Sequence, residues 1–129
     1  MVAFTLAIPQ VGPKSQAAGV FYRSEEIPVP YQFKGDEKVC LASTRDGRGT
    51  LKVDDRLDFY VYANGNLAGK WGHDFYDQTT RGIQSEFRPE DVSSLFSTGR
   101  YGVRLVLTDL HPEYYSSTAI YLVIWELHR

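Results

Sequence analysis

The sequence has little cysteine and no excess of charge of one sign, and these two shortages exclude several classes of protein. The single cysteine, Cys40, excludes an internal disulfide framework and any metal site built from several thiolates of one chain. The formal net charge is −2 with acidic and basic residues mixed, so no basic patch for nucleic acid is predicted. No basic run or basic amphipathic helix indicates binding to a membrane surface. We therefore expect neither nucleic acid nor a membrane as a partner.

The chain also lacks a recognisable secretory signal. Met1 to Ile8 is apolar, but Pro9 ends the run and no basic segment precedes it. The run instead predicts a first strand. The missing signal leaves two alternatives, a cytoplasmic protein or a part of a larger secreted one. Because the chain starts on a strand and ends on an apolar one, we expect a self-standing protein.

No setting for catalysis is recognisable either. The serines lie outside any nucleophile elbow, and the apolar neighbours of Cys40 predict a buried, unreactive thiol. His73 and Asp74 are adjacent in sequence, so within a strand their side chains point to opposite faces. Three scattered histidines do not favour zinc. We expect a protein that is not an enzyme and that needs no cofactor.

What the sequence does contain is a series of short runs typical of β-strands. Its 129 residues are enough for one domain, 1–129, with a substantial core, and its nine tyrosines favour strands and a recognition surface. The runs recur at intervals of roughly 8–12 residues between Gly- and Pro-rich turns, which predicts an all-β antiparallel β-sandwich or jelly roll. Strands are expected at Val2–Ile8, Gly19–Arg23, Glu37–Ser43, Leu57–Tyr62, Gly82–Phe87, Tyr101–Leu107 and Thr118–Leu127.

Three further segments have specific expectations. Pro28 and Pro30 place the Ser24–Gly35 segment at a sheet edge or on the surface. Pro89 to Phe96 predicts one short connector helix, with acidic residues in its first turn. The Thr118–Leu127 strand is apolar on both faces, so it lies centrally or is covered by a partner subunit, and we expect a homo-oligomer.

The stretch Val53–Asp77 carries the predicted binding site. Leu57, Phe59 and Val61 alternate with polar residues as in a half-buried strand, and Asn64-Gly65-Asn66 predicts a hairpin turn. After a second short strand, Lys70–Asp77 is expected to be a loop rich in aromatic and polar side chains.

A resemblance to a known family runs over residues 50–109. The run Val61–Gly69, then Phe87, then Asp91–Gly99, then Val103–Leu107 resembles the galactose-binding-like jelly roll, as in the sugar-binding domain of β-galactosidase and β-glucuronidase type glycosidases. That domain carries no catalytic acid, so the resemblance implies sugar binding without catalysis. The chain departs from the family where Tyr101-Gly102 replaces the usual Asn after the short helix.

The candidate ligand groups are aromatic rings that stack on a sugar and polar groups that bind its hydroxyls. Alternatively, Trp71 caps the core and the tyrosines fill a surface or an interface. Asp54 and Asp55 offer oxygen ligands for Ca²⁺, as in the lectin-like sandwich of the protective-antigen N-terminal kind that the Val53–Leu57 run resembles, or they are a solvated strand edge. The predicted ligand-binding residues are Asn64, Asn66, Trp71, His73, Asp74, Tyr76, Asp77, Tyr114 and Tyr115.

Two functions remain open at this point. The first is a non-catalytic carbohydrate-recognition module with a lectin-like β-sandwich. The second is a structural or assembly subunit, of a virion, filament or shell, that self-associates through its β-sandwich and buries the same aromatic side chains between protomers.

Overall fold

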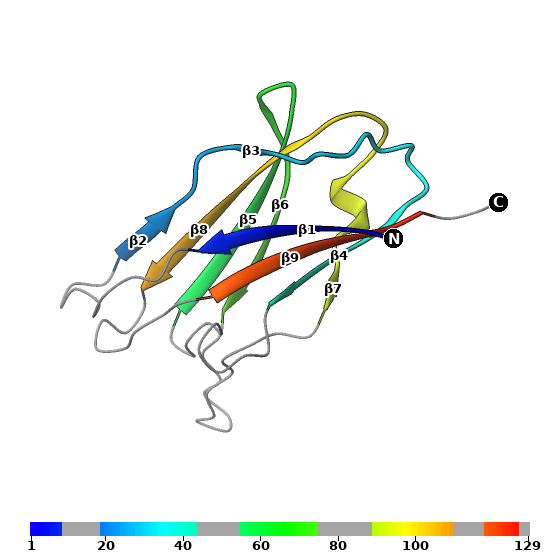
Figure 1. The fold of residues 1–129 in the computed structure, drawn as a ribbon. Coiled ribbons are helices and arrows are strands. Elements are labelled where there is room, and N and C mark those ends of the chain that lie inside the picture. The colour runs from blue at the N-terminus through cyan, green and yellow to red at the C-terminus, as the bar shows by residue number, and fades with distance from the viewer. Residues whose placement is uncertain (9–18, 44–54, 75–88, 110–117, 127–129) are drawn as a thin grey trace.

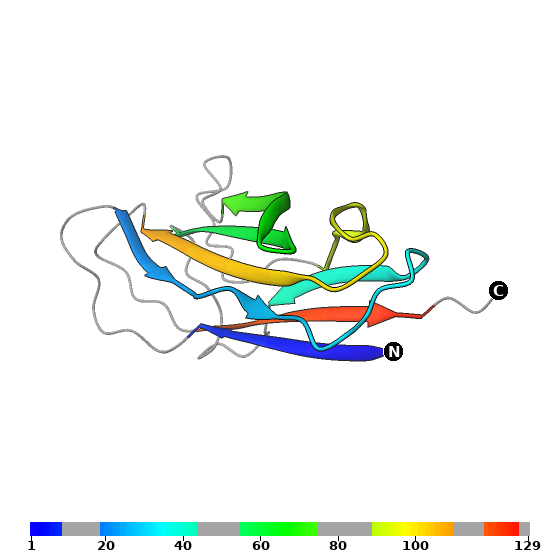
Figure 2. The ribbon, with the colours of Figure 1, turned by 90° about the horizontal axis from the view of Figure 1, so that it is seen from above.

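Alternating apolar residues build two antiparallel β-sheets that pack face to face (Figures 1 and 2). The computed structural model describes residues 1–8, 19–43, 55–74, 89–109 and 118–126. The strands are β1 (Val2–Ile8), β2 (Gly19–Arg23), β3 (Ile27–Pro28), β4 (Lys38–Ser43), β5 (Asp55–Ala63), β6 (Asn66–Asp74), β7 (Glu90–Asp91), β8 (Gly102–Asp109) and β9 (Thr118–Trp125). The predicted all-β sandwich is confirmed.

Each sheet has two interior strands and is named here after one of them. The first sheet has the order β1-β9-β4-β7 and is called the β9 sheet here. The second has the order β2-β8-β5-β6, with β3 also paired to β8, and is called the β8 sheet. Figure 2 shows the two as separate layers. The expected central position of the last strand is confirmed, because β9 pairs with β1 on one side and with β4 on the other.

The core lies between the two sheets and is filled from alternate positions of each strand. In β9 the inward side chains are fully buried, and the neighbouring Tyr121, Val123 and Trp125 face the other way and are half-buried. The strands β5 and β8 repeat this pattern in the β8 sheet. The inward residues of these three strands are Ile120, Leu122, Ile124, Leu57, Phe59, Val61, Val103, Leu105 and Leu107.

The hairpin between β5 and β6 forms at the predicted turn. Asn64 and Gly65 both have positive φ angles, 52° and 78°, as a two-residue hairpin turn requires. The expected loop from Lys70 is wrong over Lys70–Asp74, because β6 continues to Asp74 and pairs with β5. The alternation explains this difference: Trp71 faces the core and Lys70 faces solvent, so the segment suits an edge strand.

The expected connector helix is present as one turn of 3₁₀-helix, which is shorter than predicted and is preceded by a short strand. Glu90 and Asp91 pair with β4 as β7, and the helix η1 spans only Ser93–Leu95. The acidic residues therefore precede the helix and do not form its first turn. Asp91 still serves the turn, since its Oδ1 accepts hydrogen bonds from the backbone N and the hydroxyl of Ser93 at 2.9 and 2.6 Å.

Two other expectations concern the sheet edge and the thiol. Pro28 lies in β3, which among the described strands pairs with β8 alone, so the edge placement of this Pro-containing segment is confirmed. Cys40 is buried as predicted, and burial raises the pKa of its thiol, with the negative charge of Asp91 adding to the effect.

The expected Gly82–Phe87 strand lies outside the described residues. Within the parts of the chain that the structure describes, no helix has the length and apolarity needed to cross a membrane.

Candidate functional site

The outer face of the β8 sheet gathers charged and aromatic side chains from four strands. Because inward residues of β5 and β8 are apolar, the intervening residues all point outward. The antiparallel register then fixes which of them are neighbours across the sheet. Two adjacent rows result: Arg23, Val106, Asp58 and Gly72 form one, and Arg104, Tyr60 and Lys70 form the next.

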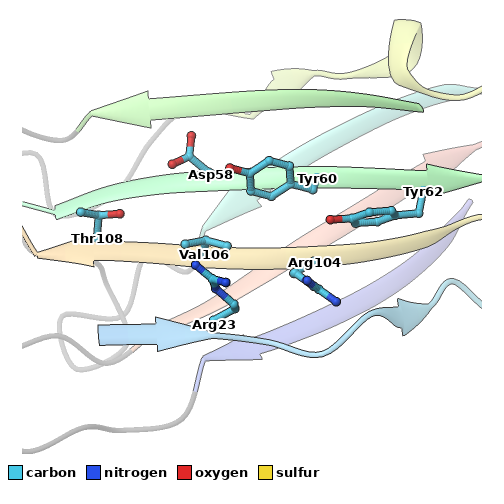
Figure 3. A pocket seen from close by; sticks show the side chains of 7 residues that line it. All are labelled: Arg23, Asp58, Tyr60, Tyr62, Arg104, Val106 and Thr108. Carbon is cyan, nitrogen blue, oxygen red and sulfur yellow. The ribbon is translucent and has the colours of Figure 1, made fainter. Parts of the chain in front are cut away.

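These rows border an open depression of about 290 Å³. Its floor contains Val106, and Figure 3 shows the rings of Tyr60 and Tyr62 along β5 with Arg23 reaching from β2 toward Val106. The walls thus offer two flat rings, guanidinium donors, a carboxylate and a hydroxyl within one shallow surface. The lining residues are Arg23, Asp58, Tyr60, Tyr62, Arg104, Val106 and Thr108.

Asp58 is the most buried charged side chain at this site. The residue is only 8% exposed, and its Oδ1 lies 3.2 Å from Nη2 of Arg56 in an ion pair. The pair is not aligned as a hydrogen bond, so within the described residues Oδ1 accepts none. Gly72 makes room for the pair: a Cβ at this position would collide with Nη2 of Arg56 and would lie 2.7 Å from Oδ1 of Asp58. The carboxylate is therefore held in place beside the depression.

The two arginines of the lining differ in their surroundings. Arg104 is half-buried, and its guanidinium lies over the Tyr62 ring, 5.6 Å from the centroid. Its Nε is buried and has no hydrogen-bond acceptor among the residues that the structure describes. Arg23 is exposed at the edge strand β2. Both arginines can donate hydrogen bonds to a ligand in the depression.

The predicted aromatic platform lies on the other side of the sheet. Trp71 is half-buried and packs against the core, and its ring stacks on that of His73 with centroids 5.8 Å apart and 5° between the planes. Both residues pair with inward residues of β5, Phe59 and Leu57. The geometry thus favours the core reading of Trp71 over the ligand platform.

Of the other predicted site residues, only Asn64 and Asn66 have described side chains, and these are not brought together with Trp71. Asn64 and Asn66 are exposed at the tip of the β5–β6 hairpin. Asp74 and Asp55 stand at strand ends, and their side chains are not described. In the part of the chain that the structure describes, no cluster of metal-binding side chains occurs. The remaining predicted residues, Asp54, Tyr76, Asp77, Tyr114 and Tyr115, lie outside the described residues.

A second polar cluster surrounds Tyr31 and is occupied by its own hydrogen bonds. The Tyr31 hydroxyl donates to Glu37 at 2.8 Å, and a carboxylate oxygen of Glu126 lies 3.3 Å from the same hydroxyl oxygen. Burial and these two carboxylates raise the pKa of Tyr31. Burial alone would raise the pKa of Glu37, but hydrogen bonds from the Lys34 backbone, Tyr31 and the Gly35 backbone outweigh it, so that this pKa lies below its ordinary value. The cluster ties the segment before β4 to the end of β9.

The residues of the depression were missed from the sequence because they are the solvent-facing half of ordinary strands. The alternation of Asp58, Tyr60 and Tyr62 shows only that they share one face. Their approach to Arg104 and Arg23 depends on pairing among strands that are distant in sequence. The one local signal is Arg104, a cation between the strand residues Val103 and Leu105.

Comparisons with known proteins add no relative to this description. No family model, no curated protein and no solved structure matches the chain. The resemblance to the galactose-binding-like jelly roll therefore stays a prediction, and the function is argued from the chain's own geometry.

Proposed function

We propose that the chain is a non-catalytic carbohydrate-binding module and that the outer depression of the β8 sheet is its site. The observation that supports this proposal is that Tyr60 and Tyr62 line one open depression together with hydrogen-bonding Arg, Asp and Thr side chains. A sugar ring presents an apolar C–H face, which stacks on an aromatic ring, and hydroxyls, which both donate and accept hydrogen bonds.

The shape of the site suits weak binding of an extended ligand. The depression is shallow and open, so a bound sugar keeps much of its surface in water. We expect a dissociation constant on the order of 10⁻⁴ M, or about −5 kcal/mol. Few anchors carry such an affinity, and here they are the two tyrosine rings.

Screening on a glycan array, followed by titration of the best glycan, tests this proposal. Tyr62→Ala should weaken binding about tenfold or more, because it removes a stacking face from the lining. The matched control is Tyr121→Ala, which removes an equally half-buried tyrosine from the outer face of the opposite sheet and should leave affinity unchanged. A wild-type protein that binds no glycan, or a Tyr62→Ala variant that binds as tightly as wild type, would refute the proposal.

The second candidate, self-association as a structural subunit, is supported by the outer face of the β9 sheet. Tyr121, Val123 and Trp125 are half-buried side by side along β9, next to buried Cys40 on β4. The charges nearby, Lys38 and Asp91, have opposite signs, so two copies meet there without net repulsion. A second copy of the chain is the occupant we assign to this face. Sedimentation that shows a monomer at high protein concentration would refute it.

A further inference from the structure

The proposed sugar site carries an excess of positive charge that a neutral sugar would not use. Among the described side chains of the outer face, four are cationic, Arg23, Arg56, Lys70 and Arg104, and two are anionic, Asp58 and Glu26, whose carboxylate lies over Gly102 of β8. The whole chain has a net charge of −2, so this excess is local. From it we infer that the depression selects acidic sugars, those that carry a carboxylate or a sulfate group. The inference rests on the proposed carbohydrate function.

Among the residues that the structure describes, no ion pair neutralises the two arginines of the lining. The carboxylate of Asp58 is engaged by Arg56, which is not part of the lining. Lys70 is placed over the ring of Tyr60, 5.6 Å from its centroid. Arg104 contacts the Tyr62 ring, which orients its guanidinium without supplying a counter-charge. Arg23 and Arg104 therefore remain available to an anionic group of the ligand.

The register places these two arginines within reach of one anion. Arg23 pairs with Val106 across β2 and β8, and Arg104 is two residues from Val106 on the same face of β8. Diagonal neighbours of this kind lie about 7–8 Å apart, which long side chains span easily. Each guanidinium can then donate two parallel hydrogen bonds to a carboxylate or a sulfate. Figure 3 shows both side chains on the same side of β5, below the two rings.

The buried Nε of Arg104 supports the same assignment. A buried N–H without an acceptor costs free energy, and such groups in folded proteins usually have a role. An anionic oxygen at the guanidinium supplies an acceptor where the described residues supply none. The two tyrosines then hold the sugar ring, and the arginines hold its acidic substituent.

The test compares three oligosaccharides of equal length: a galacturonic acid oligomer, a sulfated galactose oligomer and the neutral galactose oligomer. At least one acidic oligomer should bind about tenfold or more tightly than the neutral one. Raising the salt concentration from about 50 to about 500 mM should weaken only the acidic ligand, because the interaction is between charges near the surface. The two acidic probes distinguish a carboxylate from a sulfate.

Variants of the arginines complete the experiment. Arg23→Gln and Arg104→Gln should each reduce the preference for the acidic over the neutral oligomer about fivefold to tenfold, because Gln can still donate a hydrogen bond to a hydroxyl but carries no charge. Arg104→Lys keeps the charge but loses the paired donors, and it replaces Arg104→Gln if that variant fails to fold. The matched control is Arg100→Gln, which removes an exposed arginine outside the depression and should change neither affinity.

The possible failures are distinguishable. Equal binding of acidic and neutral oligomers, with both arginine variants unaffected, overturns the acidic selectivity and leaves the carbohydrate function standing. Inorganic sulfate binding as tightly as the sulfated oligomer shows a simple anion site and overturns it as well. Absence of binding to every oligosaccharide overturns both proposals.

Discussion

The two sheets of this protein are alike on their inner faces and different on their outer faces. Inside, both contribute fully buried Leu and Val side chains to one core, to which the β9 sheet adds Ile and the β8 sheet adds Phe59. Outside, the β8 sheet carries arginines and tyrosines around a depression, and the β9 sheet carries Tyr121, Val123 and Trp125 around a buried thiol. The same period-2 alternation produces both patterns. Folding thus constrains one face of each sheet, and the other faces are free to carry different functions.

The largest expected effect tests whether the inner faces are equivalent. Leu122 in β9 and Leu105 in β8 are both 0% exposed. Replacing either by Ala should lower the free energy of unfolding by about 2–5 kcal/mol, because each leaves a cavity in the shared core. Urea denaturation measures this change.

Val123→Ala is the control for that comparison, since it alters the outward face of the same strand. It should cost about 1 kcal/mol or less. A loss below about 1 kcal/mol for both leucine variants would contradict a single core built equally by the two sheets.

The inner faces were predictable from the sequence, and the reason is local. The alternation of apolar and polar residues within each strand is enough to identify the strand and its core-facing side chains. For this reason β1, β2, β4, β5, β8 and β9 were predictable to within a few residues. The β5–β6 hairpin was predictable because Asn64-Gly65 meets a specific backbone requirement. Acidic residues after a proline suit a helix start, so Glu90 and Asp91 gave no local sign that they pair with β4.

The candidate site was much harder to predict. A cluster of aromatic and polar residues in sequence, such as Lys70–Asp74, is divided between two faces once it becomes a strand. The depression instead combines residues from β2, β5 and β8, which only the sheet order brings together. No local pattern encodes that order.

A variant of Trp71 tests whether the inner face of the β8 sheet serves stability and its outer face serves binding. It packs against the core and pairs with Phe59, so Trp71→Ala should lower the free energy of unfolding by about 3 kcal/mol. Glycan affinity should be unchanged in the folded variant, because the depression lies on the opposite face of the sheet. Thermal melting and glycan titration of this one variant measure both. A small loss of stability together with a large loss of binding would restore Trp71 as the sugar platform.

Self-association through the outer face of the β9 sheet is tested by placing a charge at the centre of that face. If two copies associate there, Val123→Glu should convert the assembly to monomers, because two buried carboxylates would face each other without partners. Sedimentation velocity measures the change in size. Leu67→Glu is the control: Leu67 is 58% exposed on the β5–β6 hairpin, so its replacement should not alter the assembly. Dissociation by both variants would place the contact elsewhere.

The smallest expected effect is a difference in acid sensitivity. Asp91 belongs to the β9 sheet, and hydrogen bonds from the hydroxyl and then the backbone of Ser93 hold its pKa below the ordinary value of 3.8. A pKa that is lower in the folded state than in the unfolded state contributes stability above the unfolded value, and that stability is lost as the pH falls through the folded value.

The variant Asp91→Asn tests this contribution, because its side chain keeps an oxygen that accepts a hydrogen bond from Ser93 but cannot titrate. It should therefore be less stable than wild type at pH 7 by less than about 1 kcal/mol, since the group is exposed to water, and the difference should vanish below the folded pKa. Urea denaturation of both proteins between pH 2 and pH 7 measures the difference in their free energies of unfolding. An identical pH dependence in both proteins would show that Ser93 does not stabilise the charged carboxylate.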